Sequence, residues 1–182
     1  LYDTNMRARS ILFLGLGVVA ASASMQRSAL ERIDLIVPEN GFISVNPPLT
    51  PRRTGSHSTR TTHPYFLDLI QQVLHGIGLD INLLNPYQDK TKGEMIKQCG
   101  DPTLIHTILD KTVSCGKWKR KNQQCGKCVP CLIRRAAFHS AGINDGTTKG
   151  YQYNSLQAVL GDVDKHDDLL AMLIAISKHE QT

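Results

Sequence analysis

The chain has 182 residues, of which 41% are hydrophobic, and 21 Lys and Arg stand against 16 Asp and Glu. This length and apolar content suit one globular domain and argue against a disordered chain. The one continuous apolar run, at 11–20, is shorter than the roughly 20 residues that span a bilayer, so we expect no membrane partner.

The positive charge is concentrated in one segment. Residues 115–135 hold seven Lys and Arg and no acid, so that 14 basic residues face 16 acidic ones in the rest of the chain. A concentrated basic segment favours a phosphate, nucleotide or nucleic-acid partner, or is a solvated loop that keeps the protein soluble. Composition leaves both interpretations open.

The first predicted element is a helix over 11–20. Gly15 and Gly17 would let it pack closely as a buried helix of an α/β domain. The same region also has the parts of a secretory signal, because a basic stretch precedes the apolar run and Ala21-Ser22-Ala23 follows it. We favour the buried helix, since a signal would send a reduced cysteine cluster into an oxidising compartment.

Strands then alternate with helices. Residues 32–37 form a β-branched run that Pro38 ends, and 80–84 is a second strand candidate. Between them, Pro64 suits the first turn of a helix that ends near Gly76. This alternation predicts a parallel sheet flanked by helices.

Further helices are expected in the second half of the chain. Thr91 and Glu94 have the spacing of a capping box. Asp101-Pro102 opens a short helix towards Asp110. A helix that begins at Pro130 is expected to stop at Gly142, and another covers 169–176.

Four cysteines form the most specific pattern in the chain. They have the spacing C-x9-C-x2-C-x2-C and are Cys115, Cys125, Cys128 and Cys131. Four thiolates at such short spacings suit one tetrahedral zinc ion per chain. An iron–sulfur cluster and redox disulfides remain as alternatives. Because four ligands leave no open position, we expect a structural rather than a catalytic metal.

The residues around these cysteines resemble a known family. Thr112-Val113-Ser114-Cys115, the later cysteines and a set of following residues are similar to the C-terminal half of the 7-cyano-7-deazaguanine synthases of queuosine biosynthesis (QueC-like). The following residues are Arg134, Arg135, Phe138, Ala141, Gly142, Asp145, Thr147 and Tyr151. The helix start at Lys92–Met95 and the segment Arg9–Leu14 are also similar to that family.

The resemblance implies a fold and an activity. The fold would be α/β, a Rossmann-like parallel sheet with flanking helices of the adenine nucleotide alpha hydrolase type, and the protein would be cytoplasmic. The family uses ATP with Mg²⁺ to convert a 7-carboxy-7-deazaguanine-type carboxylate to an amide and then to a nitrile. The partners implied are ATP and a small deazapurine, with no nucleic acid.

The resemblance also suggests site residues. Arg9, Arg134 and Arg135 are candidates for binding phosphate. Glu39 and Asn40, at the carboxyl end of a predicted strand, are candidates for substrate contacts, as is Arg60. The resemblance assigns no catalytic residue in this chain.

Two departures from the family are visible. The chain contains no Ser-Gly-Gly-x-Asp-Ser phosphate loop, and 39–64 lacks a Gly-Tyr-Pro-Asp-Cys substrate segment. We therefore interpret the chain as the C-terminal portion of a longer ligase, inactive alone and similar to the Qat-type branch of anti-phage operons. A homodimer or defence-operon partner proteins would then be expected.

This interpretation divides the chain into three parts. Residues 1–110 would be a partial nucleotide-binding domain, 111–151 the zinc-binding loop and helix, and 152–182 a helical tail. A non-catalytic zinc-containing partner subunit and a zinc-ribbon nucleic-acid-binding module are the alternatives. A zinc ribbon would place strands, rather than a helix, around the cysteines.

Overall fold

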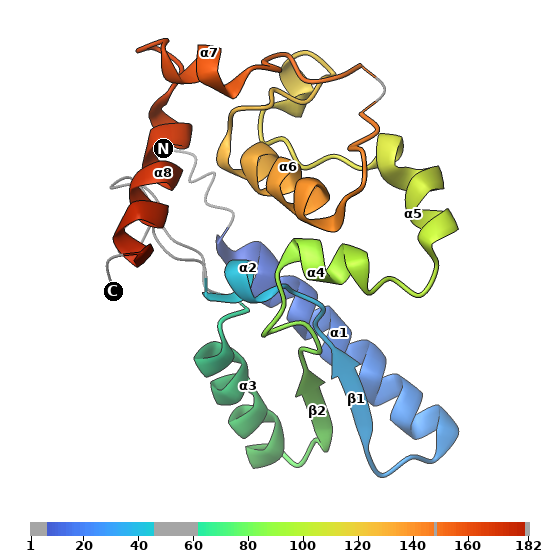
Figure 1. The fold of residues 1–182 in the computed structure, drawn as a ribbon. Helices are drawn as coiled ribbons and strands as arrows, with labels where there is room; N and C mark the ends of the chain where they lie inside the picture. Colours follow the sequence, from blue (N-terminus) through green and yellow to red (C-terminus); the bar gives the residue numbers. More distant parts are fainter. Residues whose placement is uncertain (1–6, 46–61, 148, 181–182) are drawn as a thin grey trace. The chain divides into compact units, whose positions relative to one another are not determined.

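The computed structural model describes residues 7–45, 62–147 and 149–180. In chain order (Figure 1), the elements are α1 (Arg7–Ser28), β1 (Ile33–Ile36), α2 (Gly41–Val45), α3 (Pro64–Gly76), β2 (Ile81–Leu84), α4 (Lys92–Lys97), α5 (Pro102–Ile108), the 3-10 turns η3 (Leu109–Lys111) and η4 (Trp118–Arg120), α6 (Val129–Ala141), α7 (Leu156–Leu160) and α8 (Asp167–Glu180).

The elements form two compact units, which divide between Lys90 and Thr91. The first unit holds α1 to β2 and the second holds α4 to α8. The boundary predicted at residue 110 does not coincide with this division. The difference arises because α4 packs along α6, so the helices before the cysteines belong with the cysteine region.

The two strands form a parallel pair, as the alternation of strands and helices predicts. Ile33 lies opposite Ile81 and Ile36 lies opposite Leu84. In the described part of the chain this sheet has two strands. The fold class is therefore mixed α/β, and a larger Rossmann-like sheet remains a proposal.

The core of the first unit lies on one face of this sheet. Ile81 is fully buried there, together with Leu74 of α3 and Ala21 of α1. The side chains packed around them come from both helices and both strands: Val18, Met25, Ile33, Leu35, Ile70, Leu79 and Leu83. A Cβ atom at Gly17 would lie 3.2 Å from Leu35 Cδ2, which fits the close packing expected at that glycine.

The helix α1 is present but is not buried, contrary to the prediction. Phe13 is 64% exposed and Val19 66% exposed, and Ala21 is its one buried residue among those described. Only one stripe of the helix contacts the sheet. By length and composition alone, Ile11–Ser28 could cross a membrane, with a mean hydropathy of 1.3. Core helices of soluble proteins and signal sequences share this property.

The opposite face of the sheet is uncovered by the described part of its own unit. Ile36 is 58% exposed and Leu84 38% exposed on this face. Asn82 Nδ2 donates a hydrogen bond to Asp34 Oδ1 across the two strands, at 2.9 Å. Parallel sheets in α/β proteins are usually covered on both faces, so two strands and two helices make up an incomplete layer.

The two edges of the sheet differ. Gln71 of α3 reaches the outer edge of β2, where its Nε2 donates to Ile81 O at 2.7 Å and its Oε1 accepts from Leu83 N at 2.7 Å. These are the groups that a further parallel strand would bind. No strand among the described residues pairs with the outer edge of β1. The sheet is closed beside β2 and open beside β1.

Local signals place the helix ends. His63 caps α3 by accepting a hydrogen bond from Tyr65 N, and Pro64 occupies its first turn. Thr91 and Glu94 form the predicted capping box of α4. Asp101 accepts from Leu104 N at the start of α5. These predictions are confirmed because each depends on residues within one turn.

The second unit is built around α6. Gly93 of α4 is buried against it, since a Cβ atom there would lie 3.1 Å from Ser140 Cβ and 3.2 Å from Ala137 O. On another side Leu132 of α6 forms a buried cluster with Val159 of α7 and Leu169 of α8. The helix stops at Gly142, whose φ of 70° is left-handed, as the sequence predicts.

Candidate metal centre

The four predicted cysteines lie together in the second unit. Cys115 precedes η4, Cys125 follows it, Cys128 is the N-cap of α6 and Cys131 lies in the first turn of that helix. All four are buried, and their Sγ atoms lie within 4.8 Å of one another. Trp118 and Tyr151 pack against the cluster.

The sulfur geometry fits a tetrahedral metal. Four sulfurs at about 2.3 Å from one ion at tetrahedral corners are about 3.8 Å apart. Here Cys125 Sγ lies 3.9 Å from Cys131 Sγ, and Cys128 Sγ lies 4.0 Å from Cys115 Sγ. All four cysteines are free, and these separations are far beyond a disulfide bond of about 2.05 Å. The donor set therefore fits zinc.

Backbone amides point at the sulfurs. Cys115 Sγ accepts hydrogen bonds from Lys117 N and Cys125 N, both at 3.3 Å, and Cys125 Sγ accepts from Cys128 N at 3.4 Å. Hydrogen bonds of this kind stabilise thiolate over thiol. The loop is thus shaped to hold charged sulfur.

Gly126 makes the sharp turn between two of the cysteines. Its φ is +81°, and a Cβ atom would lie 2.6 Å from Tyr153 O and 2.8 Å from Tyr151 Cβ. Both the left-handed backbone and the close approach require glycine at this position.

The thiols influence one another's ionisation when no metal is bound. A hydrogen bond with Cys131 lowers the pKa of Cys128 to about 5 and raises the pKa of Cys131, while burial raises the pKa of Cys125. One thiolate is thus already favoured at neutral pH. A divalent ion would displace the remaining protons, because thiolate is the ligand form.

Arg134 lies beside this centre and is almost fully buried. Its guanidinium forms an ion pair with Asp145, with Nη2 2.6 Å from Oδ1. Nη1 donates to Thr112 Oγ1 at 2.6 Å, and Nη2 donates to Leu109 O at 3.0 Å. The ring of Phe138 lies under the guanidinium, 4.8 Å from Cζ. All these contacts are internal and give Arg134 a structural task, while its phosphate contact stays a prediction.

Arg135 points into the loop that follows α6. Its Nη1 donates to Gly126 O and Tyr153 O, and its Nη2 donates to Asn154 O at 2.6 Å. Its guanidinium also lies over the ring of Tyr151. Carbonyl oxygens of the cysteine loop and the later loop therefore bind this arginine, and its phosphate role stays a prediction.

The predicted substrate residues belong to the other unit. Asn40 is buried and caps α2, since its Oδ1 accepts a hydrogen bond from Ile43 N. Glu39 is half-buried just after β1, and its carboxylate has no hydrogen-bond partner among the described residues. Arg60 and the side chain of Arg9 lie outside the described residues.

Asp145 and Tyr151 are the residues whose importance the sequence did not reveal. The Tyr151 hydroxyl donates to Asp145 Oδ2, and burial raises the pKa of Tyr151, with the Asp145 contact adding to the effect. This keeps the phenol protonated as a donor. The family resemblance contained both residues, but no local pattern signals that they join Arg134.

Comparison with known proteins agrees with the resemblance. Residues 61–142 match the family model described as "Queuosine biosynthesis protein QueC". The chain is 39% identical over 69 residues to the "7-cyano-7-deazaguanine synthase" of Brucella ovis and to that of Brucella melitensis biotype 2.

These alignments cover 38% of this chain and 28% of each relative, so the chain spans about a quarter of the length of the curated relatives it matches. No solved structure matches. The family-model match runs from the start of α3 to the end of α6 and includes all four cysteines. Over this segment the chain is similar to QueC.

Proposed function

We propose that this chain is the C-terminal portion of a QueC-like synthase that uses ATP to convert a 7-carboxy-7-deazaguanine-type carboxylate to an amide and a nitrile. The observation that carries the proposal is the closed four-cysteine centre, which lies within the segment that matches the family model. The carboxylate-to-nitrile chemistry comes from the family resemblance and not from this geometry.

Zinc would have a structural role in this enzyme. When bound to the four cysteines, it would tie the loop around η4 to the first turn of α6. Four sulfur ligands leave no position for water or substrate, so the ion would stabilise the fold and not activate a nucleophile.

The substrate side of the proposal rests on the end of β1. Ligands of open α/β sheets bind beyond the carboxyl ends of the strands, and Glu39 follows β1 there with an unengaged carboxylate. We assign Glu39 to the deazapurine, while Asn40 shapes the same turn by capping α2. Arg9 and Arg60 remain predicted contacts.

The ATP-binding loop would lie on further strands that pair beside β1. Two features support this part of the proposal: the open edge of β1 and the uncovered face that carries Ile36 and Leu84. The two-strand unit alone offers no glycine-rich loop for phosphates, so we expect this chain to be inactive without them.

A specialised branch of the family is also part of the proposal. The family-model match begins at residue 61, and the preceding Pro/Arg/Thr-rich segment departs from the usual substrate sequence. This departure favours a modified substrate, as in the Qat-type proteins of anti-phage operons, with a homodimer or operon proteins as partners in the cytoplasm.

The second candidate is a non-catalytic zinc-containing partner subunit, which the missing phosphate-loop motif favours. A zinc ribbon is less consistent with the structure, because α6 begins at Val129 and contains the fourth cysteine. The one β-type contact described beside the cysteines is an isolated bridge between Gln124 and Tyr151.

The test compares this chain with the full-length gene product. We expect the full-length protein to hydrolyse ATP only with the carboxylated deazapurine and to form a nitrile, whereas this chain alone turns over nothing. Glu39→Gln should raise KM for the deazapurine and leave zinc content at one per chain. A full-length protein that neither consumes ATP nor binds the deazapurine would overturn the synthase in favour of the partner subunit.

A further inference from the structure

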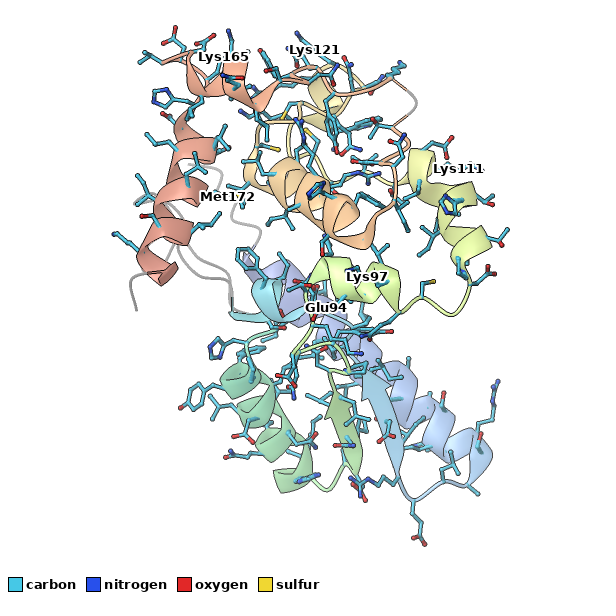
Figure 2. The ribbon with its side chains drawn as sticks, viewed as in Figure 1. Glu94, Lys97, Lys111, Lys121, Lys165 and Met172 are labelled. Atoms are coloured by element: carbon cyan, nitrogen blue, oxygen red, sulfur yellow. The ribbon has the colours of Figure 1, made fainter. Side chains whose placement is uncertain are left out.

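A small cavity borders the cysteine centre. Its volume is about 210 Å³, and Cys125 and Tyr153 form part of its wall. Four cationic side chains line it, and no acidic side chain does: Lys117, Arg120, Lys121 and Lys127. Figure 2 labels Lys121 at the end of the second unit where η4 lies. The cavity is thus a concentrated positive site rather than part of an evenly charged surface.

Most of these cations have no side-chain partner in the part of the chain that the structure describes. The side chains of Lys117, Arg120 and Lys121 are exposed and form no ion pair or hydrogen bond with any described residue. Lys127 is half-buried and donates to Lys165 O at 3.1 Å, with its ammonium 5.4 Å from the centre of the Tyr153 ring. Three charges are therefore available to a ligand.

The metal centre does not account for all this charge. Zinc with four thiolates has a net charge of minus two, because four negative sulfurs exceed the two charges of the ion. The four cations of the cavity leave a surplus of about two positive charges. Backbone amides and the neighbouring thiols supply the hydrogen bonds that reach the sulfurs, and no lysine or arginine side chain of the described residues donates to a sulfur.

We propose that this cavity binds a phosphate group. Its charge suits a dianion or trianion, and a volume of about 210 Å³ suits one or two phosphoryl groups better than a whole nucleotide. The guanidinium of Arg120 supplies planar paired donors and the lysines supply point charges, a combination common in phosphate recognition. The same chemistry serves a free pyrophosphate and the backbone of a nucleic acid, and the small volume of the cavity favours the free anion.

The experiment measures binding of inorganic pyrophosphate and of a short oligouridylate to the zinc-loaded chain by calorimetry at several salt concentrations. The double variant Lys117→Gln/Lys121→Gln should weaken the affinity for pyrophosphate about two- to thirtyfold, since each exposed ion pair adds a modest increment. The matched control is Lys97→Gln/Lys111→Gln, which removes the same charge from exposed positions of α4 and η3. It should leave affinity unchanged.

The outcomes separate the possibilities. Pyrophosphate binding that only the cavity variant weakens supports the site and a free phosphorylated ligand. The chain could instead bind the oligouridylate alone, and the slope of log K against log salt concentration could become about 1.4 shallower in the cavity variant. That result supports the site and assigns its phosphate to a nucleic acid. Binding of neither probe, or equal losses in both double variants at full zinc content, overturns the proposal. None of these results depends on synthase activity.

Discussion

Replacing Arg134 with alanine tests whether this residue belongs to the fold or to a phosphate site. Its side chain is 4% exposed and that of its partner Asp145 is 11% exposed. Removing one partner of a buried ion pair typically costs about 3–5 kcal/mol, because the other charge stays buried without compensation. Asp145 would retain only the Tyr151 hydroxyl, and Leu109 O and Thr112 would each lose a donor.

The expected loss is large against the total stability of a domain. Native domains are stable by about 5–15 kcal/mol, so Arg134→Ala should lower the urea midpoint of the second unit markedly. Arg134→Lys should lose less, since an ammonium can keep one contact with Asp145 but not the planar set of donors.

Trp118 provides the assay. It is the one tryptophan of the chain and packs against the four cysteines. Its fluorescence therefore reports unfolding of the unit that contains the four cysteines. Lys97→Ala, an exposed change in α4 of the same unit, should shift the stability by less than about 0.5 kcal/mol.

One result would refute this reasoning. Suppose that the free energy of unfolding of Arg134→Ala lies within about 1 kcal/mol of the parent's, and that the full-length enzyme with this substitution loses affinity for ATP. Arg134 would then bind phosphate, as first predicted. If the buried ion pair instead stabilises the fold, the interaction energy between Arg134→Ala and Asp145→Asn in a double-mutant cycle should exceed about 1 kcal/mol.

Three further changes test the other features. Gly126→Ala should destabilise the metal-loaded protein by at least about 2 kcal/mol, because of the positive φ and the close approach to Tyr153 O. The control is Gly116→Ala, where a Cβ atom meets nothing within 4 Å. Equal urea midpoints for the two variants would contradict the argument that the turn requires glycine. Zinc should leave as the pH falls into the acid range, because protons compete with the ion for the thiolates of the four cysteines; a dye-release titration in which zinc stays fully bound in acid would contradict this. Gln71→Leu should lower the free energy of unfolding by about 1–3 kcal/mol and cause self-association in sedimentation, because Ile81 O and Leu83 N lose their partner. The control is Gln72→Leu, which removes an amide that donates to Asp68 and should behave as the parent does. A Gln71→Leu variant that stays monomeric would contradict the argument that Gln71 protects the sheet edge.

Sequence reasoning succeeded where neighbouring residues decide the structure. The Thr91 capping box, the start of α3 at Pro64 and the stop of α6 at Gly142 are all set within one helical turn. The cysteine spacing was also enough to predict that the four side chains gather at one place, because three of them lie within seven consecutive residues, at 125–131.

The contacts between residues far apart in the chain could not be predicted from the sequence. Arg134 pairs with a residue eleven positions away and bonds a carbonyl 25 positions away, and no periodicity marks such partners. The exposure of α1 was likewise not predicted. A hydrophobic composition shows that a helix can be buried, but it does not show which part of the protein, if any, packs over the helix. Glu39 was located correctly at the end of β1, but its role is still a prediction.

Gln71 determines which edge of the sheet can accept a further strand. In the part of the chain that the structure describes, its amide occupies the outer edge of β2, so a second molecule would add a strand beside β1. Two copies that joined through this edge would use up both open edges, so the assembly would end as a symmetric pair. Propagation into a fibre needs two open edges on each molecule. For such an assembly, the Gln71 side chain would decide between a closed dimer and an unlimited polymer.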